Sequence, residues 1–160
     1  MDTAPTLCAD VISFVKTYDN KKITLFLYDT SGQERFHSIA KSFYRKGRVC
    51  ILVYDVTNRE TLIKLEYWLN DMKENCEEEN VLYICVGNKI DLPRVVTHEE
   101  GMEFAQKHQL LYTETSALTC EGVEDLFKEL MMQAIENGLV QESVINQTQL
   151  DSKSESYSCC

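Results

Sequence analysis

The sequence predicts an α/β fold, a mostly parallel sheet with helices on both faces. Three observations lead to this prediction: a β-hairpin pattern comes first, two apolar runs follow at 49–54 and 81–86, and helical patterns alternate with those runs. Continuous apolar runs are typical of strands buried on both faces. Strands that alternate with helices are typical of parallel sheets.

Length and composition limit the possible classes. The chain has 160 residues, 44% apolar and 26% charged, enough for one globular domain with a sizeable core. We expect that domain over residues 1–138 and a flexible polar tail over 139–160, where periodicity is lost. The formal net charge of −10 argues against a nucleic-acid partner, which requires a basic face. Seven cysteines without a C-x-x-C pair argue against a zinc site and favour a reducing, cytosolic compartment.

The first elements are predicted from residue type and turn signals. Residues 9–18 are rich in Val, Ile, Phe and Tyr, Asp19-Asn20 forms a turn signal, and residues 23–28 form a second apolar segment. This pattern predicts a β-hairpin. Polar residues dominate 29–39, which we interpret as a loop that leads into a short helix near Lys41.

The helices that follow are predicted from caps and apolar spacing. Thr57 and Glu60, like Thr97 and Glu100, have the spacing of a capping box. We therefore expect one helix from Thr57 and another from Thr97 to about His108.

The last elements are a strand and a helix. A short strand is expected at 110–112. One apolar helical face runs over 123–135, and Gly138 ends that helix.

Polar residues stand where three of these strands end. Asp29, Asn88 and Ser116 each stand at the carboxyl end of a predicted strand. Ligands of open α/β sheets bind beyond the carboxyl ends of the strands. The sequence therefore predicts one polar binding rim at this end of the sheet.

The segment Asp29-Thr-Ser-Gly-Gln-Glu34 has the chemistry of a phosphate and metal site. The Asp29 carboxylate suits Mg²⁺, which prefers hard oxygen ligands. Gly32 lets its backbone N–H approach a phosphate closely, and the Gln33 amide can orient an attacking water. A plain polar turn is the simpler alternative, but the complete string is too specific for it.

Asn88-Lys-Ile-Asp91 has the chemistry of a purine reader. The Asp91 carboxylate can accept hydrogen bonds from N1–H and the 2-amino group of guanine, a pair that adenine lacks. The stem of Lys89 can lie along the purine face, and Asn88 contributes an amide. Taken alone, this tetrapeptide could also be a polar exit from a strand.

Glu114-Thr-Ser-Ala117 leaves two alternatives open. The backbone N–H groups of Ser116 and Ala117 could meet the guanine carbonyl. Ser/Thr residues before the last helix could equally be helix caps. The neighbouring motifs favour the first interpretation.

The motifs together resemble the Rab family of small GTPases. The resemblance spans roughly residues 6–135 and rests on the strings Asp29-Thr-Ser-Gly-Gln-Glu-Arg-Phe36, Ser42-Phe-Tyr-Arg45, Leu52-Val-Tyr-Asp-Val-Thr57, Asn88-Lys-Ile-Asp91 and Glu114-Thr-Ser-Ala117. It implies a Ras-like P-loop NTPase fold, a guanine-nucleotide switch in vesicle traffic, GTP or GDP with Mg²⁺ as cofactors, and Rab effectors and regulators as partners. It also implies that the hydroxyl of Thr6 binds magnesium beside Asp29. Cys8, Val11 and Leu118 depart from the family pattern, which has glycine, phenylalanine and lysine there.

The family's phosphate loop is not found in these residues. None of the six glycines is followed at the required offset by Gly-Lys-[Ser/Thr]. That loop supplies the backbone N–H nest and the lysine that meet the phosphates. We therefore expect the first strand, the phosphate loop and the first helix of the fold to be missing, and nucleotide binding and hydrolysis to be weakened or lost. An alternative start, a truncated gene model, a degenerate copy and a genuinely shortened regulator all fit.

The terminal Cys159-Cys160 resembles the double-geranylgeranyl signal of Rab proteins. It implies contact with the prenylation machinery and lipid attachment to the cytoplasmic face of intracellular membranes, in exchange with the cytosol. Two lipids give stable anchoring where one does not. An incidental pair of thiols is the alternative.

Two functions from different classes remain. The first is a Rab-like switch, in which Gln33 positions water, Thr6 and Asp29 serve magnesium, and Asn88, Lys89 and Asp91 read guanine. The second is a non-catalytic interaction module that binds effectors or prenylation machinery without cycling.

Overall fold

The computed structural model describes residues 10–18, 21–30 and 43–140. Several predictions fall outside these residues: Thr6, Gly32, Gln33, the short helix expected near Lys41, and Cys159 and Cys160. The described strand ends and loops carry the other predicted site residues, Asp29, Asn88, Lys89, Asp91, Ser116 and Ala117.

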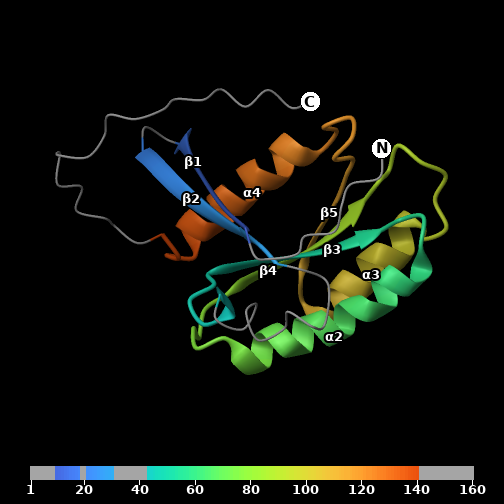
Figure 1. Cartoon of the computed structure of the whole chain (residues 1–160), viewed down its shortest axis with the longest axis horizontal. Coiled ribbons are helices and arrows are strands. Elements are labelled where there is room, and N and C mark those ends of the chain that lie inside the picture. Colours follow the sequence, from blue (N-terminus) through green and yellow to red (C-terminus); the bar gives the residue numbers. More distant parts are fainter. Residues whose placement is uncertain (1–9, 19–20, 31–42, 141–160) are drawn as a thin grey trace.

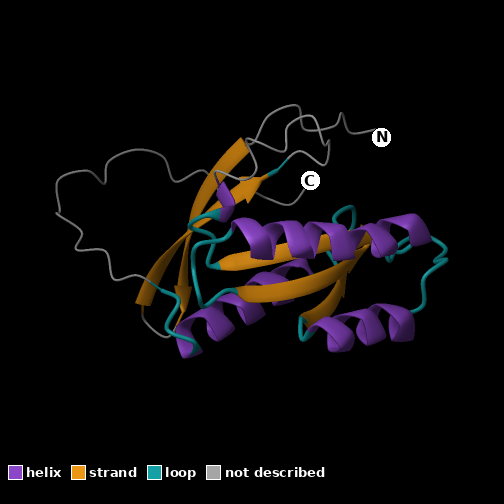
Figure 2. Cartoon of the chain, turned by 90° about the horizontal axis from the view of Figure 1, so that it is seen from below, coloured by secondary structure: helices purple, strands orange, loops and turns teal. Residues whose placement is uncertain are grey.

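The predicted hairpin is confirmed. β1 (Asp10–Tyr18) and β2 (Lys21–Asp29) pair antiparallel, in register from Asp10 opposite Asp29 to Tyr18 opposite Lys21. Figure 2 shows the pair as a separate two-stranded sheet beside one end of the larger sheet.

The larger sheet is parallel and has the strand order β3-β4-β5. β3 (Val49–Asp55), β4 (Leu82–Asn88) and β5 (Leu111–Thr115) lie close to the predicted runs. β5 was expected only over 110–112, and it continues to Thr115 because its later residues pair with β4 as far as Asn88. Part of the motif that we expected in a loop is therefore held in the sheet.

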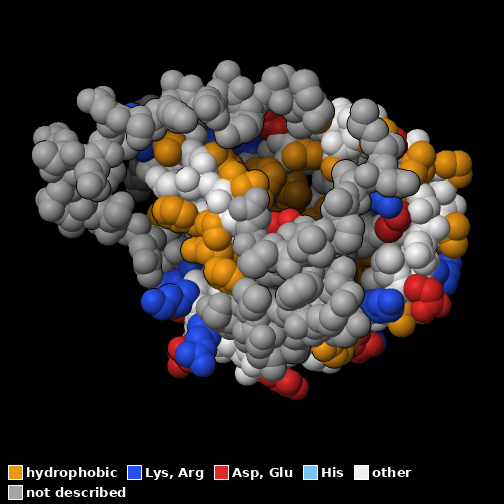
Figure 3. Space-filling view, in the orientation of Figure 1, with side chains coloured by type: hydrophobic (Ala, Val, Ile, Leu, Met, Phe, Trp, Pro, Cys, Tyr) orange, Lys and Arg blue, Asp and Glu red, His pale blue; other side chains and the backbone are white. Residues whose placement is uncertain are grey.

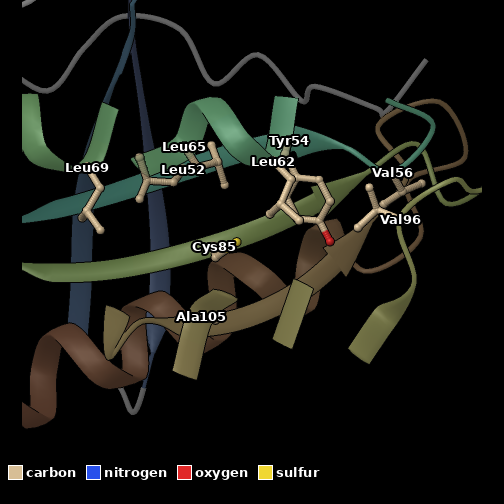
Figure 4. Close-up of a cluster of buried hydrophobic side chains, with 9 residues drawn as sticks. All are labelled: Leu52, Tyr54, Val56, Leu62, Leu65, Leu69, Cys85, Val96 and Ala105. Carbon is tan, nitrogen blue, oxygen red and sulfur yellow. The ribbon is translucent and has the colours of Figure 1, made fainter. Parts of the chain in front are cut away.

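Helices cover both faces of this sheet, as predicted (Figure 1). α2 (Arg59–Asn75) and α3 (His98–His108) share one face, where their apolar residues form a core with β3 and β4. Figure 4 shows this core, with Leu52 and Tyr54 of β3 beside Leu62 and Leu65. α4 (Val123–Glu136) covers the other face through Leu126 and Leu130, which pack on Ile84 and Val86.

One of the two predicted capping boxes is confirmed. Thr97 and Glu100 cap α3 reciprocally. The other prediction is wrong: the N-cap of α2 is Asn58, whose side chain accepts from the Glu60 backbone N–H. The hydroxyl of Thr57 instead donates to Asp55 at 2.7 Å, because a strand-terminal carboxylate is the nearer partner.

Within the described residues, no ladder hydrogen bonds join the two sheets. Among the described strands, β2 pairs with β1 alone and β3 with β4 alone. Apolar side chains remain exposed on the hairpin: Val11, Ile12, Val15, Phe26 and Tyr28. Figure 3 shows apolar side chains at the surface in the region where Figure 1 places the hairpin. The hairpin does contact the rest of the domain, with Phe14 packed edge-to-face on Phe127 of α4.

Candidate functional site

Three polar residues occupy equivalent positions at the carboxyl ends of the parallel strands. The register places Asp55 opposite Asn88 and Asn88 opposite Thr115. Each residue is the last of its strand. Of the predicted rim, Asn88 ends β4 and Ser116 follows β5, whereas Asp29 ends β2 in the separate hairpin sheet. Asp55 is a member of the rim that the sequence motifs did not single out for the site.

Asn88 ties β4 to the loop after β5. Its side-chain oxygen Oδ1 accepts from the hydroxyl of Thr115 at 3.2 Å and from the backbone N–H of Ala117 at 3.0 Å. The backbone N–H of Ile90 also donates to the carbonyl of Thr115. Asn88 thus fixes the loop that presents Ala117, which is a positioning role.

Ser116 binds Asp91 directly. Its hydroxyl donates to Asp91 Oδ1 at 2.5 Å and accepts from the backbone N–H of Thr119 at 3.1 Å. Ser116 is 0% exposed, whereas Asp91 is exposed. A carboxylate offers about four lone-pair positions on its two oxygens, so the hydroxyl orients Asp91 and leaves acceptor capacity on the solvent side. Ser116 therefore orients Asp91 and stabilises its own loop. The alternative that Ser/Thr residues cap the last helix is wrong, because the N-cap of α4 is Gly122 and no side chain caps that helix.

Lys89 lies across the rim in a left-handed backbone conformation, with φ of 70°. Its ammonium Nζ is 2.6 Å from Asp55 Oδ2, and Asp55 Oδ1 accepts from the backbone N–H and the hydroxyl of Thr57. Burial raises the pKa of Asp55, but the hydrogen bonds from Lys89 and Thr57 outweigh it and the pKa lies below its usual value. The ion pair holds the Lys89 stem along the rim beside Asn88.

Glu114 anchors the end of β5 from the α3 side. Its carboxylate accepts two hydrogen bonds from Arg94, at 3.1 and 3.2 Å, and one from the hydroxyl of Tyr112 at 2.9 Å. Nδ1 of His98 is 3.3 Å from Glu114 Oε2. Burial raises the pKa of Glu114, and the hydrogen bonds from Arg94, Tyr112 and His98 lower it further than burial raises it.

The Glu114 network continues into the core. The hydroxyls of Tyr54 and Tyr112 are 3.0 Å apart, and since the Tyr112 proton points to Glu114, Tyr54 is the donor in this pair. Figure 4 shows Tyr54 within the core between β3 and its covering helices. The network therefore connects Glu114, which precedes Thr115 at the rim, to the hydrophobic core that contains Tyr54.

The comparisons with known proteins agree with this geometry. The model of the Ras family matches residues 1–136. Ras-related protein Rab-18 of Caenorhabditis briggsae is 41% identical over 136 residues, which are 84% of this chain and 67% of that protein. Ras-related protein Rab-18-B of Danio rerio is 43% identical over 148 residues, 89% of this chain and 72% of that protein. The chain belongs to the Rab-type small GTPases of the Ras family.

This Rab-family chain brings together the predicted base-reading residues. Asn88, Lys89, Asp91, Ser116 and Ala117 surround one rim, linked by the contacts described above. Of the predicted metal ligands, only Asp29 is described, at the end of β2 and exposed. In the described ranges, no three His, Cys, Asp or Glu residues cluster as a complete metal site. Asp29 alone would still suit Mg²⁺, because this ion is often bound through only one or two carboxylates and keeps several of its own waters.

Sequence reasoning missed the two anchoring carboxylates, Asp55 and Glu114. The signal for Asp55 was available, because it ends an apolar run as Asn88 does. Two partners of Glu114, Arg94 and His98, lie in the loop before α3 and at the start of α3, so local patterns do not reveal them.

Within the described part of this Rab-family chain, no helix is both long and apolar enough to cross a bilayer.

Proposed function

We propose that this chain acts as a Rab-type guanine-nucleotide switch component in vesicle traffic, whose rim selects the base while its hold on the phosphates is weak. The carrying observation is the hydrogen bond from Ser116 to Asp91, beside Ala117 held by Asn88. It orients a carboxylate toward solvent at the carboxyl end of a parallel sheet, where such folds bind ligands.

Base selection follows from the donors and acceptors at this rim. Guanine presents N1–H and a 2-amino group side by side, and the Asp91 carboxylate complements both. The backbone N–H of Ala117, which donates to Asn88 Oδ1 in this structure, would exchange that acceptor for the guanine carbonyl. The Lys89 stem provides an apolar surface for the ring. Adenine would leave the carboxylate without donors, which is costly for a polar group that loses its water.

We expect this chain to bind the phosphates weakly. The 160 residues contain no G-x-x-x-x-G-K-[ST] string, so the backbone nest and lysine of such a loop are not supplied by this sequence. Asp29 and Thr6 would share a magnesium ion, Gly32 would donate to a phosphate, and Gln33 would orient water. Hydrolysis depends on positioned charges around the transferred phosphoryl group, so we expect it to be slow or lost.

The decisive experiment compares guanosine, GDP and GTP as ligands of the purified full chain. If the base carries the binding, the three affinities fall within about tenfold of one another, whereas adenosine binds at least about tenfold more weakly. Isothermal titration calorimetry with and without Mg²⁺ measures this. Nanomolar, magnesium-dependent GTP binding would contradict the weak hold on phosphates. Equal binding of adenosine and guanosine would contradict base reading.

A second candidate is an interaction module that binds Rab effectors or prenylation machinery without cycling. The exposed apolar side chains of the hairpin favour it, since contiguous exposed apolar surface is typical of protein contact sites. Its test is binding of a purified effector in the presence of GDP or GTP. An effector affinity that does not depend on the nucleotide would favour this module over the switch. That affinity should be lost in Phe26→Ser and kept in the control Ile63→Ser on α2.

Membrane attachment is proposed through lipids on Cys159 and Cys160 alone. Between 139 and 160 the charged residues are Glu142, Asp151, Lys153 and Glu155, so no polybasic patch assists. Replacing both cysteines with serine should move the protein from the membrane pellet to the supernatant. A doubly substituted chain that still pelleted with vesicles would refute attachment by lipid.

A further inference from the structure

A cavity lies between β5 and α4, away from the carboxyl-end rim. Its volume is about 340 Å³, within the range of small-ligand and side-chain pockets. Its apolar lining comes from Ile84, Leu111 and Leu126, and its polar lining includes Asp125 and Glu129. Figure 1 shows α4 passing beside β5, and the cavity opens between these two elements.

The two carboxylates share one side of α4. Asp125 and Glu129 are four residues apart and therefore lie on the same helix face. Among the described residues, neither has a lysine, arginine or histidine within ion-pair distance. Glu129 accepts one hydrogen bond, from Nε2 of Gln133 at 3.1 Å. The cavity thus combines an apolar floor with negative charge that these residues leave uncompensated.

The outer edge of β5 borders the same cavity. β5 pairs with β4 on one side, and in the described ranges no strand pairs with its other side. Leu111, Tyr112 and Thr113 belong to this edge strand and also line the cavity. An exposed edge presents backbone N–H and C=O groups to an added strand, and such a strand places every second side chain over the α4 face.

We propose that this groove, made of the β5 edge and the Asp125–Glu129 face of α4, binds an extended segment of a partner protein that carries an arginine or lysine. The backbone of the segment pairs with β5. The methylene stem of its basic residue lies on Ile84, Leu111 and Leu126, and the cationic head lies between the two carboxylates. Charge complementarity favours a basic partner, because the chain has a formal net charge of −10. The proposal does not depend on nucleotide binding.

The test uses a synthetic peptide, acetyl-Thr-Val-Arg-Val-Thr-amide, titrated into the ¹⁵N-labelled full chain. We expect amide shifts confined to β5 and α4, and slower hydrogen exchange along Leu111–Thr113. Norleucine in place of the peptide's arginine should weaken binding about tenfold. Glu129→Gln and Asp125→Asn should each weaken it about two- to fivefold, the range of exposed charge pairs. Glu124→Gln, on the same helix but outside the cavity lining, is the matched control and should leave the affinity unchanged.

Several outcomes would overturn the proposal. No shift at millimolar peptide, equal binding of the norleucine peptide, or equal loss in the Glu124→Gln control would each refute it. Binding of arginine amide as tightly as the peptide would show a small-molecule amine site without strand pairing. Retention of circular dichroism in both carboxylate variants confirms that any loss is not caused by unfolding.

Discussion

The hydroxyl of Ser116 and the carboxylate of Asp91, 25 residues apart in sequence, are joined by a hydrogen bond of 2.5 Å. This bond links the loop after β4 to the loop after β5. The same hydroxyl accepts from the backbone N–H of Thr119, so one fully buried group stabilises the second loop and aims the carboxylate of the first.

Ser116→Ala should therefore lower both stability and base selection. It removes two hydrogen bonds and leaves the backbone N–H of Thr119 without its partner, which costs about 1–3 kcal/mol of unfolding free energy. Urea denaturation followed by Trp68 fluorescence measures this cost. Leu118→Ala changes a side chain that is 80% exposed in the same loop and should alter stability by less than about 0.5 kcal/mol. Equal losses in both variants would contradict a special role for the hydroxyl.

Asp91→Asn should change which purine binds. The amide keeps one acceptor and gains a donor, so it no longer complements the adjacent N–H groups of guanine. Xanthine, which carries an oxygen in place of the 2-amino group, complements the new donor. We expect guanosine to bind at least about tenfold more weakly and xanthosine to bind more tightly than to the unsubstituted chain, as measured by calorimetry. Unchanged preference for guanosine would show that another group reads the base.

Glu114→Gln should make the free energy of unfolding depend less on pH under acidic conditions. The pKa of Glu114 in the folded chain lies below its ordinary value of 4.5. Its carboxylate therefore stabilises the fold above that value, and this contribution is lost as pH falls from 4.5 through the folded pKa. Urea midpoints of the Trp68 fluorescence transition, measured between about pH 6 and pH 3, should fall less steeply in the variant than in the unsubstituted chain.

The matched control for the pH experiment is Glu124→Gln. Glu124 is an exposed carboxylate in the first turn of α4, outside the Glu114 network. Its replacement should keep the steep acid limb of the unsubstituted chain. If urea midpoints fall with pH as steeply in Glu114→Gln as in Glu124→Gln, the hydrogen bonds from Arg94, Tyr112 and His98 do not favour the charged form of Glu114.

Gly101→Ala should destabilise the domain although alanine favours helices. A Cβ at Gly101 would collide with the hydroxyls of Tyr54 and Tyr112, and Tyr54 is buried in the core. Overpacking of this kind costs about 1–3 kcal/mol, more than the roughly 1 kcal/mol that alanine gains over glycine in a helix. Glu103→Ala, on the exposed face of α3, is the control and should be close to neutral. Stabilisation by Gly101→Ala would show that the two tyrosines can move apart.

The part of the rim at the end of β4 was predictable from the apolar run that precedes it. Asn88 and Asp91 stand next to a run that is long enough to identify as a buried strand, and parallel topology brings such ends together. Thr57 was misassigned for a local reason. Its spacing to Glu60 fits a capping box, but the hydroxyl and the backbone N–H of Thr57 both donate to the carboxylate of Asp55, two residues earlier. The pattern of a capping box does not reveal a competing acceptor outside it.

The interactions that hold the rim in place are mostly long-range and were not predictable. Lys89 meets Asp55 across two strands, and Glu114 meets Arg94 and His98 from the start of α3 and the loop before it. The length of β5 was underestimated because Thr113, Glu114 and Thr115 are too polar to extend an apolar run. They remain in the strand because pairing with β4 satisfies their backbone.

The separation of the hairpin from the parallel sheet affects how the molecule melts. Without ladder hydrogen bonds between β2 and β3, the hairpin can detach while β3, β4 and β5 keep their shared cores. Heat or urea should then produce two transitions with different midpoints rather than one cooperative step. Trp68, the single tryptophan, packs against the core of the parallel sheet, so its fluorescence follows only the later transition, whereas far-ultraviolet circular dichroism follows both.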